Sequence, residues 1–398
     1  MQADSMKTVP HACGTIAIVY SEAASGPHSA ATALKDVLQT RNPNCHVRLV
    51  NIAEIFDHHP LFGKFVRTAI RFFNWQLRND SVVGLKKLID LSLFCHNLVG
   101  KRGIRKIAQY WKSSPADMVV SVTPMYNPVL YRSAQLANPD VQCITVPVDF
   151  EEARSNYWFT PNVKQHYLNG SARLQLQAAK AGIPEKERFR IDGMPVGICA
   201  YECTPHNRNE QLRAIGLNPS WPVGFLSFGA QGSRGIVAIT KALAQQHRHL
   251  NLIIMCGKNK KLYKQVTALK LPFPVAVYTY LPKTPLRHLH LADFAIGKPG
   301  TMTITESLIT QTPLIVQQSK GMRPIQKANE EWLKQAKTGI VASTPETIAA
   351  SVNEIVNNPV FKEQMDEYHH QALYQMAAFI EKIGKLNQIH KPYLHVTA

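Results

Sequence analysis

The sequence predicts an α/β protein made of two doubly wound, Rossmann-like domains with a cleft between them. Three observations lead to this prediction. Short apolar runs alternate with segments of helical periodicity, as in parallel sheets with crossover helices. The alternation stops in a polar stretch at 202–211 and then starts again. The length of 398 residues, with 45% hydrophobic and 18% charged residues, is enough for two ordinary cores.

The first domain is expected to cover residues 1–204. Its strands are predicted by apolar runs at 14–20, 46–52, 117–122 and 141–149. Helical spacing of apolar residues predicts helices over 28–39 and 171–181. In sheets of this kind, ligands bind beyond the carboxyl ends of the strands, so the functional residues should lie in the loops that follow them.

The second domain is expected to cover residues 205–375. Its strands are predicted at 222–229, 251–257, 293–298, 313–318 and 339–343, with helices from residue 236, over 303–311 and over 325–337. Thr344 followed by Pro345 predicts another helix start, because Thr caps and Pro is favoured at the first helical position. Residues 376–398 should form a helix and tail that cross back to the first domain.

The composition of the chain indicates in which cellular compartment the protein is expected. No uncharged apolar stretch is long enough to span a membrane, and the first residues do not have the pattern of a secretory signal. The seven scattered cysteines predict reduced thiols in a cytoplasmic protein. Cys199, Cys203 and His206 lie close together, but their spacing matches no usual zinc pattern. We therefore expect no metal site.

Positive charge is concentrated in one segment. The chain has a formal net charge of +18, and residues 62–112 hold eleven Lys and Arg against two Asp, which is +9. Aromatic residues interleave with these charges, which favours docking to an anionic membrane surface by a peripheral protein. Nucleic-acid binding and a solvated helical insert are the alternatives. The residues expected to dock are Phe72, Phe73, Trp75, Lys86, Lys87, Lys101 and Arg102.

Three polar loops follow strands of the second domain. The loop 229–235 has glycines that permit close backbone approach, and the helix start after it offers free amides to a diphosphate. The loop 297–307 combines a lysine, a glycine and threonines with Glu306, whose carboxylate can accept both hydroxyls of a ribose. The loop 319–329 brings Gln326 and Asn329 to a third helix start. Together the loops are typical of a nucleotide-diphosphate site.

These motifs resemble a known family. KPGTMTITES (298–307) is similar to the lysine-proline-glycine and threonine-glutamate signature of processive diacylglycerol glucosyltransferases and plant monogalactosyldiacylglycerol synthases. FGAQGSRG (228–235) resembles their glycine-rich phosphate loop, and SGPHSAATAL (25–34) resembles their glycine–histidine helix start. Residues 146–196 hold the family's Asp and Trp in the same order. The resemblance covers most of residues 14–375.

The resemblance implies a GT-B glycosyltransferase that inverts the sugar carbon and transfers a hexose from UDP-glucose or UDP-galactose to a lipid acceptor. Residues carried over to the UDP-sugar side are Gly229, Gly232, Ser233, Lys298, Gly300, Thr301, Thr303, Glu306, Gln326 and Asn329. His28 and Asp149 match the acceptor side. The sequence departs from the family pattern at Pro27, Arg154, Thr301, Met322 and Arg323.

An inverting transfer needs a general base on the acceptor side of the cleft. Asp149 follows an apolar strand and is the preferred candidate, because burial would raise its pKa. His28, at a helix start that favours the neutral imidazole, is the other candidate, and the order between them stays open. No paired-aspartate motif suits a metal-bound diphosphate, so no cofactor is expected. A UDP-N-acetylglucosamine 2-epimerase and a catalytically silent nucleotide-sugar or membrane-binding protein are the competing interpretations.

Overall fold

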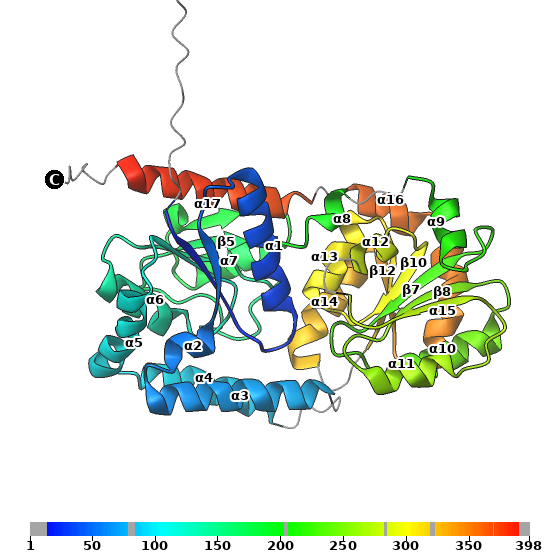
Figure 1. Cartoon of the computed structure of the whole chain (residues 1–398), viewed down its shortest axis with the longest axis horizontal. Coiled ribbons are helices and arrows are strands. Elements are labelled where there is room, and N and C mark those ends of the chain that lie inside the picture. Colours follow the sequence, from blue (N-terminus) through cyan, green and yellow to red (C-terminus); the bar gives the residue numbers. More distant parts are fainter. Residues whose placement is uncertain are drawn as a thin grey trace, which may run out of the picture.

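The computed structural model describes residues 14–78, 84–202, 206–281, 285–318, 323–368 and 370–389. These residues form two lobes that lie side by side, each with a parallel six-stranded sheet covered by helices (Figure 1). The two sheets contain strands from residues 16–190 and from residues 223–342 respectively. The architecture is therefore the GT-B arrangement of two Rossmann-like domains that the sequence predicts.

The N-terminal sheet has the strand order β2-β1-β3-β4-β5-β6, with every neighbouring pair parallel. Buried Ile, Val and Ala side chains fill its central strands, as expected for a sheet covered on both faces. The strands are β1 (Ile16–Tyr20), β2 (Val47–Asn51), β3 (Met118–Ser121), β4 (Gln142–Thr145), β5 (His166–Asn169) and β6 (Arg188–Arg190). The helices that connect them are α1 (Gly26–Arg41), α2 (Ile52–Phe56), α6 (Asn127–Ala137) and α7 (Ala172–Lys180).

Three further helices are inserted between β2 and β3. They are α3 (Pro60–Arg78), α4 (Leu85–Asn97) and α5 (Lys101–Ser113). Figure 1 shows α3 and α4 along the lower edge of the N-terminal lobe. One face of α3 is apolar and packs on the lobe: Phe62 and Val66 are buried against Phe56 and its neighbours.

The C-terminal sheet has the order β12-β11-β10-β7-β8-β9, also entirely parallel. Its strands are β7 (Val223–Ser227), β8 (Asn251–Met255), β9 (Val275–Tyr278), β10 (Phe294–Gly297), β11 (Leu314–Gln317) and β12 (Gly339–Ala342). Its helices include α10 (Gly235–Gln246), α11 (Lys260–Thr267), α13 (Thr301–Ile309), α14 (Arg323–Ala336) and α15 (Pro345–Asn357). The expected Thr344 cap is confirmed, since its hydroxyl accepts from the Thr347 amide in a capping box.

Short helices α8 (Cys199–Glu202) and α9 (Arg208–Ala214) lie between the two sheets in sequence. After α16 (Val360–Asp366), the last helix α17 (Ala372–Ile389) returns to the N-terminal lobe and lies along α1 (Figure 1). Arg41 of α1 donates two hydrogen bonds to Glu381 of α17, both of 3.0 Å. α17 thus makes the expected return to the N-terminal lobe, but it begins at residue 372 rather than at residue 376.

The two lobes share one continuous apolar cluster. Beside the gap, the ring of Phe150 stacks on Trp332 of α14, with centroids 4.9 Å apart and planes inclined by 11°. Arg173 of α7 donates to Gln335 of α14 at 3.4 Å. These contacts fasten the loop after β4 to α14, so the functional loops of both lobes are held near one another.

Some local expectations were wrong. The fourth apolar run was expected to be strand through Asp149, but β4 ends at Thr145 and the remaining residues form a loop. Strands β5, β6 and β9 were not predicted, because they are three or four residues long and carry His, Arg or Tyr. The cysteines are not all thiols. Cys199 is disulfide-bonded, whereas Cys45, Cys95, Cys143 and Cys256 are free.

Candidate active site

The two sheets turn corresponding edges toward each other. Strand order reverses between β1 and β3 in one lobe and between β7 and β10 in the other, and such switch points are where ligands bind. The loops at these points meet across the gap. A Cβ added to Gly229, after β7, would lie 3.8 Å from Ser25 Oγ, and one added to Gly26 would lie 3.7 Å from Met302 Cγ.

The glycine-rich loop after β7 serves two purposes. Gly229 has a φ of 79° and faces the other lobe, so its backbone is the part of this loop nearest the gap. Gly232, with a φ of 67°, is packed instead against β8, because a Cβ there would lie 2.5 Å from Cys256 O. Ser233 Oγ accepts from the Gly235 amide at 3.1 Å, which shapes the turn into α10. Gly232 is thus required by packing, whereas Gly229 lies at the gap between the lobes.

The loop after β10 leads directly into α13. Gly300 is the N-cap residue and supplies no side-chain cap, so the first amides of α13 have no acceptor within the helix. Thr301 is buried, whereas Lys298 and Thr303 are half-buried. An uncapped helix start carries partial positive charge and free N–H donors, which suit an anion.

Asn329 braces this loop from α14. Its side-chain amide donates to Pro299 O at 2.8 Å and to Thr301 Oγ1 at 3.4 Å, and the residue is 5% exposed. It therefore positions the loop, whereas the sequence suggested that it faces phosphate or sugar. Gln326, one turn earlier in α14, is half-buried. Met322 and the side chain of Arg323, two of the departures from the family pattern, lie outside the described residues.

The Glu306 carboxylate has no partner among the residues that the structure describes. It sits on α13, and within the described part of the chain no hydrogen bond or ion pair involves its side chain. Burial raises its pKa to about 7. A partly buried carboxylate left unpaired is costly, and the cost is recovered when a ligand supplies hydroxyl donors.

Asp149 lies on the N-terminal side, in the loop after β4. Trp158 Nε1 donates to its Oδ2 at 2.8 Å, while Oδ1 has no partner among the described residues. Burial raises the pKa of Asp149 to about 6, and the Trp158 hydrogen bond lowers it in part. The carboxylate is held in one orientation, with one oxygen available and a pKa suited to accepting a proton near neutral pH.

His28 is placed differently. It lies in the first turn of α1, is exposed, and packs edge-on against Tyr20 with ring centroids 4.8 Å apart. Pro27 beside it lines the same pocket as Asp149, whereas His28 does not. Asp149 therefore has the better position for a base within this pocket.

The pocket lies between the carboxyl edge of the N-terminal sheet and the inserted helices α3 and α4. It encloses about 830 Å³ of empty space, part of it open to solvent. Its walls come from the loops after β1, β3 and β4 and from the inner faces of α3 and α4, and most of the side chains are apolar. A mostly apolar lining with a few polar groups is typical of small-molecule sites.

Several features of this pocket were not found from the sequence. Ala24 and Met125 line it with φ values of 61° and 70°, a conformation that non-glycine residues rarely adopt and that is enriched at functional sites. Trp158 contacts Asp149 from nine residues away. Nothing in the residue spacing indicates positive φ, but a Trp close to a candidate base could have been considered as its donor.

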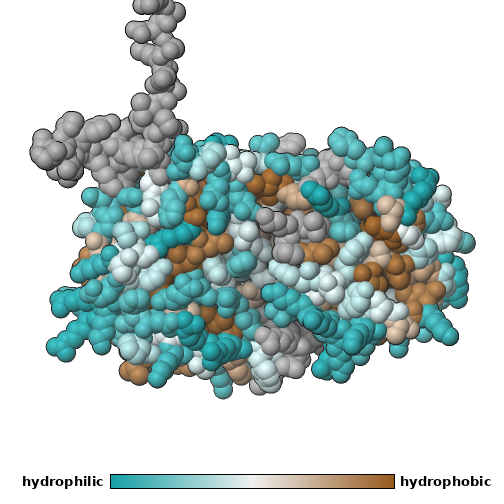
Figure 2. Space-filling model, viewed as in Figure 1, coloured by the Kyte–Doolittle hydropathy of each residue, from teal (hydrophilic) through white to brown (hydrophobic). Residues whose placement is uncertain are grey.

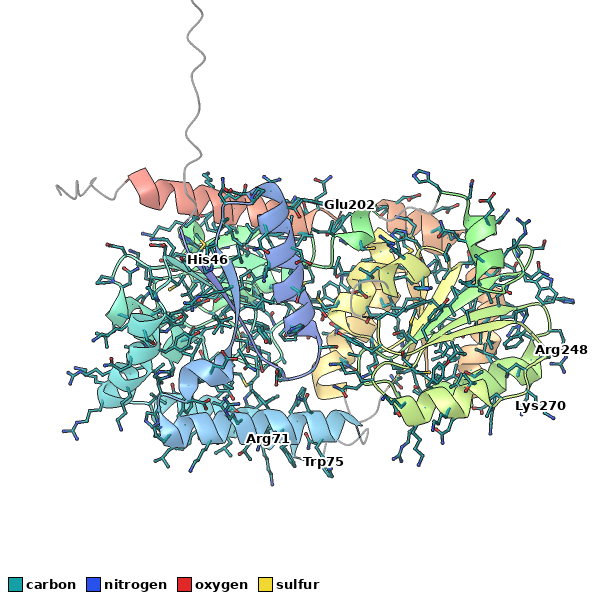
Figure 3. All side chains as sticks on the ribbon, viewed as in Figure 1. His46, Arg71, Trp75, Glu202, Arg248 and Lys270 are labelled. Atoms are coloured by element: carbon teal, nitrogen blue, oxygen red, sulfur yellow. The ribbon has the colours of Figure 1, made fainter. Side chains whose placement is uncertain are left out.

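Only some of the residues expected to dock at a membrane lie on the outer surface of the inserted helices. Phe72 and Trp75 are 41% and 55% exposed and stack on each other, and Lys87, Lys101 and Arg102 are exposed. Figure 3 shows Arg71 and Trp75 pointing away from the body of the molecule. Phe73 was expected on this outer face but lines the pocket, because it lies on the opposite side of α3. The side chain of Lys86 lies outside the described residues.

Exposed apolar side chains continue on α4 and just beyond it. Leu91, Phe94 and Leu98 are 48%, 59% and 65% exposed. Figure 2 shows hydrophobic areas between hydrophilic ones along the edge where α3 lies. No helix within the described ranges is long and apolar enough to cross a membrane.

Comparison with known proteins finds a family match in the C-terminal half of the chain. A family model described as the glycosyltransferase family 28 C-terminal domain matches residues 227–381. The processive diacylglycerol beta-glucosyltransferase of Staphylococcus saprophyticus is 25% identical over 67% of this chain and 66% of its own length. Monogalactosyldiacylglycerol synthase 1 of Arabidopsis thaliana is 29% identical over 53% of this chain and 40% of its own. The chain thus spans less than two thirds of the length of these relatives.

Solved structures with a similar fold cover nearly the whole chain. The rhamnosyltransferase SpnG has a TM-score of 0.59 at 12% identity and covers 93% of this chain and 99% of its own. MurG of Acinetobacter baumannii has a TM-score of 0.58 at 14% identity and covers 92% of this chain and 99% of its own. A UDP-N-acetylglucosamine 2-epimerase has a TM-score of 0.56 at 10% identity and covers 97% of this chain and 99% of its own. These similarities show the fold and do not separate transferase from epimerase.

The loops after β7 and β10 and the start of α14 lie within residues 227–381, the region that the family model matches. The chain is a two-domain protein of the GT-B fold whose residues 227–381 match the glycosyltransferase family 28 C-terminal domain and whose sequence is similar to diacylglycerol glucosyltransferases and monogalactosyldiacylglycerol synthases.

Proposed function

We propose that the protein is an inverting glycosyltransferase that moves a hexose from UDP-glucose or UDP-galactose to the hydroxyl of a lipid such as diacylglycerol. The observation that carries the proposal is the position of Asp149. Its carboxylate lines an apolar pocket in one lobe, and the loop after β1 in that lobe meets the uncapped start of α13, the helix that carries Glu306, in the other. The relatives named for diacylglycerol glycosyl transfer support this choice of acceptor.

On the donor side, the diphosphate binds at the start of α13 and beside Gly229. The amides at the start of the helix and the charge of Lys298 stabilise the diphosphate as negative charge develops on it. Glu306 accepts hydrogen bonds from the ribose hydroxyls. We propose that these groups suffice without a metal ion or other cofactor.

On the acceptor side, the lipid hydroxyl donates to Asp149 Oδ1. Its oxygen attacks the anomeric carbon, the bond from that carbon to the phosphate oxygen breaks, and UDP leaves. The hydroxyl proton moves to Asp149, so the products are the glycolipid, UDP and a proton later released to water. Trp158 keeps Oδ2 occupied and thereby fixes which oxygen acts as the base.

The acceptor is a bilayer component, so the protein must reach the membrane. We propose that it is a cytoplasmic, peripheral protein that docks through α3, α4 and the start of α5. Exposed aromatic rings and basic side chains on these helices are typical of interfacial binding, in which rings enter the headgroup boundary and cations attract anionic lipids. The exposed residues that support this are Phe72, Trp75, Phe94, Lys87, Lys101 and Arg102.

Charge reversal tests this surface. The triple variant Lys87→Glu, Lys101→Glu and Arg102→Glu should lower co-sedimentation with phosphatidylserine-containing vesicles, because each basic residue near such a surface contributes about 1 kcal/mol. A matched control reverses Lys260, Lys261 and Lys264 on α11 of the other lobe and should leave binding unchanged. Equal sedimentation of the two triple variants would remove α4 and α5 from the docking surface.

The function itself is tested by coupling between donor and acceptor. UDP-glucose and UDP-galactose are supplied with or without diacylglycerol-containing vesicles, in buffer with EDTA, and both UDP and glycolipid are measured. UDP release that requires the lipid and matches glycolipid formation is expected. Conversion of UDP-N-acetylglucosamine to its epimer would identify an epimerase instead, and UDP-sugar binding without turnover would identify a silent protein.

A further inference from the structure

We propose that the pocket beneath α3 and α4 is a slot for one acyl chain of a neutral glycerolipid, with the free hydroxyl of that lipid at Asp149. This inference rests on the proposed function and specifies its acceptor site. It selects an uncharged lipid over phospholipids and other phosphorylated lipids. It also assigns α3 two roles, one for each of its faces.

The pocket is preformed because its roof is fastened on two sides. Asn74 of α3 donates to Glu22 O at 2.8 Å and accepts from the Ala24 amide at 3.0 Å, which ties α3 to the loop after β1. Asp90 of α4 forms an ion pair with Arg154 at 2.8 Å, which ties α4 to the loop that follows Asp149. Arg154, a departure from the family pattern, therefore has a role in holding the roof.

The walls match an alkyl chain. Ala69, Ile70 and Phe73 of α3, with Leu88 and Ile89 of α4, form the roof, and Val148 lies opposite in the loop after β4. Three of the hydroxyl-bearing residues in the pocket are engaged within the protein. Ser21 Oγ accepts from the Ala23 amide, and the Ser92 hydroxyl bonds to Tyr126.

Charge selects the class of lipid. Among the described residues that line the pocket, Asp149 is the only charged one, and none is Lys or Arg. A phosphate group next to this carboxylate would be repelled and would have no cation to pair with, whereas a hydroxyl can donate to Oδ1. A neutral glycerolipid with one free hydroxyl satisfies both conditions.

The path from the bilayer is short. The outer faces of α3 and α4 expose Phe72, Trp75, Leu91 and Phe94, and their inner faces line the slot. The thickness of one helix, about 10 Å, therefore separates the proposed docking surface from the slot. A chain that leaves the bilayer beside α3 can enter the slot while the second chain stays in the membrane.

Bromine quenching of tryptophan fluorescence tests the slot directly. The probe is dioctanoylglycerol with brominated acyl chains. It is added to the full-length Trp75→Phe variant, so that the exposed indole of Trp75 does not contribute to the fluorescence. Quenching of Trp158, which lines the pocket, should saturate with the lipid and vanish in the Trp158→Phe double variant. Dioctanoylphosphatidic acid should compete at least about tenfold more weakly, because a phosphate beside an unpaired carboxylate is repelled.

Filling the slot should abolish this binding. Ala69→Phe in the same background places a ring in the chain's position and should weaken the affinity at least about tenfold. Thr68→Phe, on the exposed side of the same helix, is the matched control and should bind normally. Each methylene removed from the chain should weaken binding about fourfold in the control and have no such effect in Ala69→Phe. If Ala69→Phe does not fold, Ala23→Leu at the half-buried rim replaces it.

Two results would overturn the slot: no quenching of Trp158 in the Trp75→Phe protein, or equal affinity in folded Ala69→Phe and Thr68→Phe. Binding of phosphatidic acid as tight as that of the diacylglycerol would refute its selectivity for neutral lipids. Failure of the proposed function gives a different pattern. In that case the lipid binds in the slot, but no hexose is transferred when UDP-sugar is supplied.

Discussion

The C-terminal lobe places a third strand, β9, beside β8, whereas the N-terminal lobe places the helices α3, α4 and α5 after β2. The two sheets are otherwise alike in direction and in the order of their central strands. In the C-terminal lobe the helices that start at the switch point, α10 and α13, have no side-chain caps. In the N-terminal lobe α3 and α4 cover it and turn it into an apolar pocket. One sheet architecture thus provides two opposite ligand environments.

The two buried carboxylates, one in each lobe, also differ in their surroundings. Asp149 and Glu306 both have pKa values raised by burial, to about 6 and about 7. Asp149 is held by a donor from its own chain, and Glu306 has no partner within the described residues. The difference suggests that one carboxylate is oriented for proton transfer and the other is left for a ligand to satisfy. Substitutions at Asp149 and Glu306 test this difference.

The largest effect is expected at Asp149. Asp149→Asn keeps the shape and the Trp158 contact but removes the base, so the rate of transfer should fall by about 10²–10⁴-fold. The affinity for UDP, measured by calorimetry, should remain unchanged because UDP binds the other lobe. His28→Ala is the parallel measurement. A greater loss of rate in His28→Ala than in Asp149→Asn would transfer the role of base to His28.

A smaller effect is expected at Glu306. Glu306→Ala should weaken UDP binding by about 10–100-fold, because hydrogen bonds to a charged group contribute about 1.5–3 kcal/mol. Wild-type affinity should rise with pH through about 7, as the carboxyl loses its proton and accepts both ribose hydroxyls. Glu306→Gln should show no such pH dependence. Full UDP affinity in the Ala variant would show that the ribose lies elsewhere.

The smallest effect is expected at Trp158. The wild-type kcat/KM should rise with pH through about 6, since only the ionised Asp149 can accept the proton. Removing the indole donor in Trp158→Phe destabilises the ionised form and raises the pKa of Asp149, so this midpoint should move to higher pH. Activity should recover at pH 8. A uniform loss of activity at every pH would mean that Trp158 acts through packing alone.

Most strand–loop–helix units of the C-terminal lobe could be predicted from the sequence because each depends on a short local pattern. Gly229, Gly300 and Thr303 follow strands directly, and the start of a helix after a strand places them without reference to the rest of the chain. The role of Asn329 could not be predicted, because its bond to Pro299 spans thirty residues and depends on how α14 packs.

The N-terminal lobe was harder to predict. The sequence indicated that 62–112 is basic and aromatic, but helical spacing did not show which rings face outward. Phe72 and Phe73 are adjacent, yet one is exposed and the other lines the pocket. The pocket itself is formed by segments from residue 21 to residue 158, so no local pattern could reveal it. Asp149 could be proposed in advance because a polar residue after an apolar run is a local signal.

The return of α17 to the N-terminal lobe has a consequence for biosynthesis. Ala372, Leu373, Met376, Ala377 and Ile380 are fully buried in the cluster that also contains Ile18 and Leu34. The N-terminal lobe therefore lacks part of its interior until residues 372–380 leave the ribosome. A nascent chain stalled before residue 372 should expose this apolar surface to chaperones, and severing α17 should impair the lobe that is most distant from it in sequence.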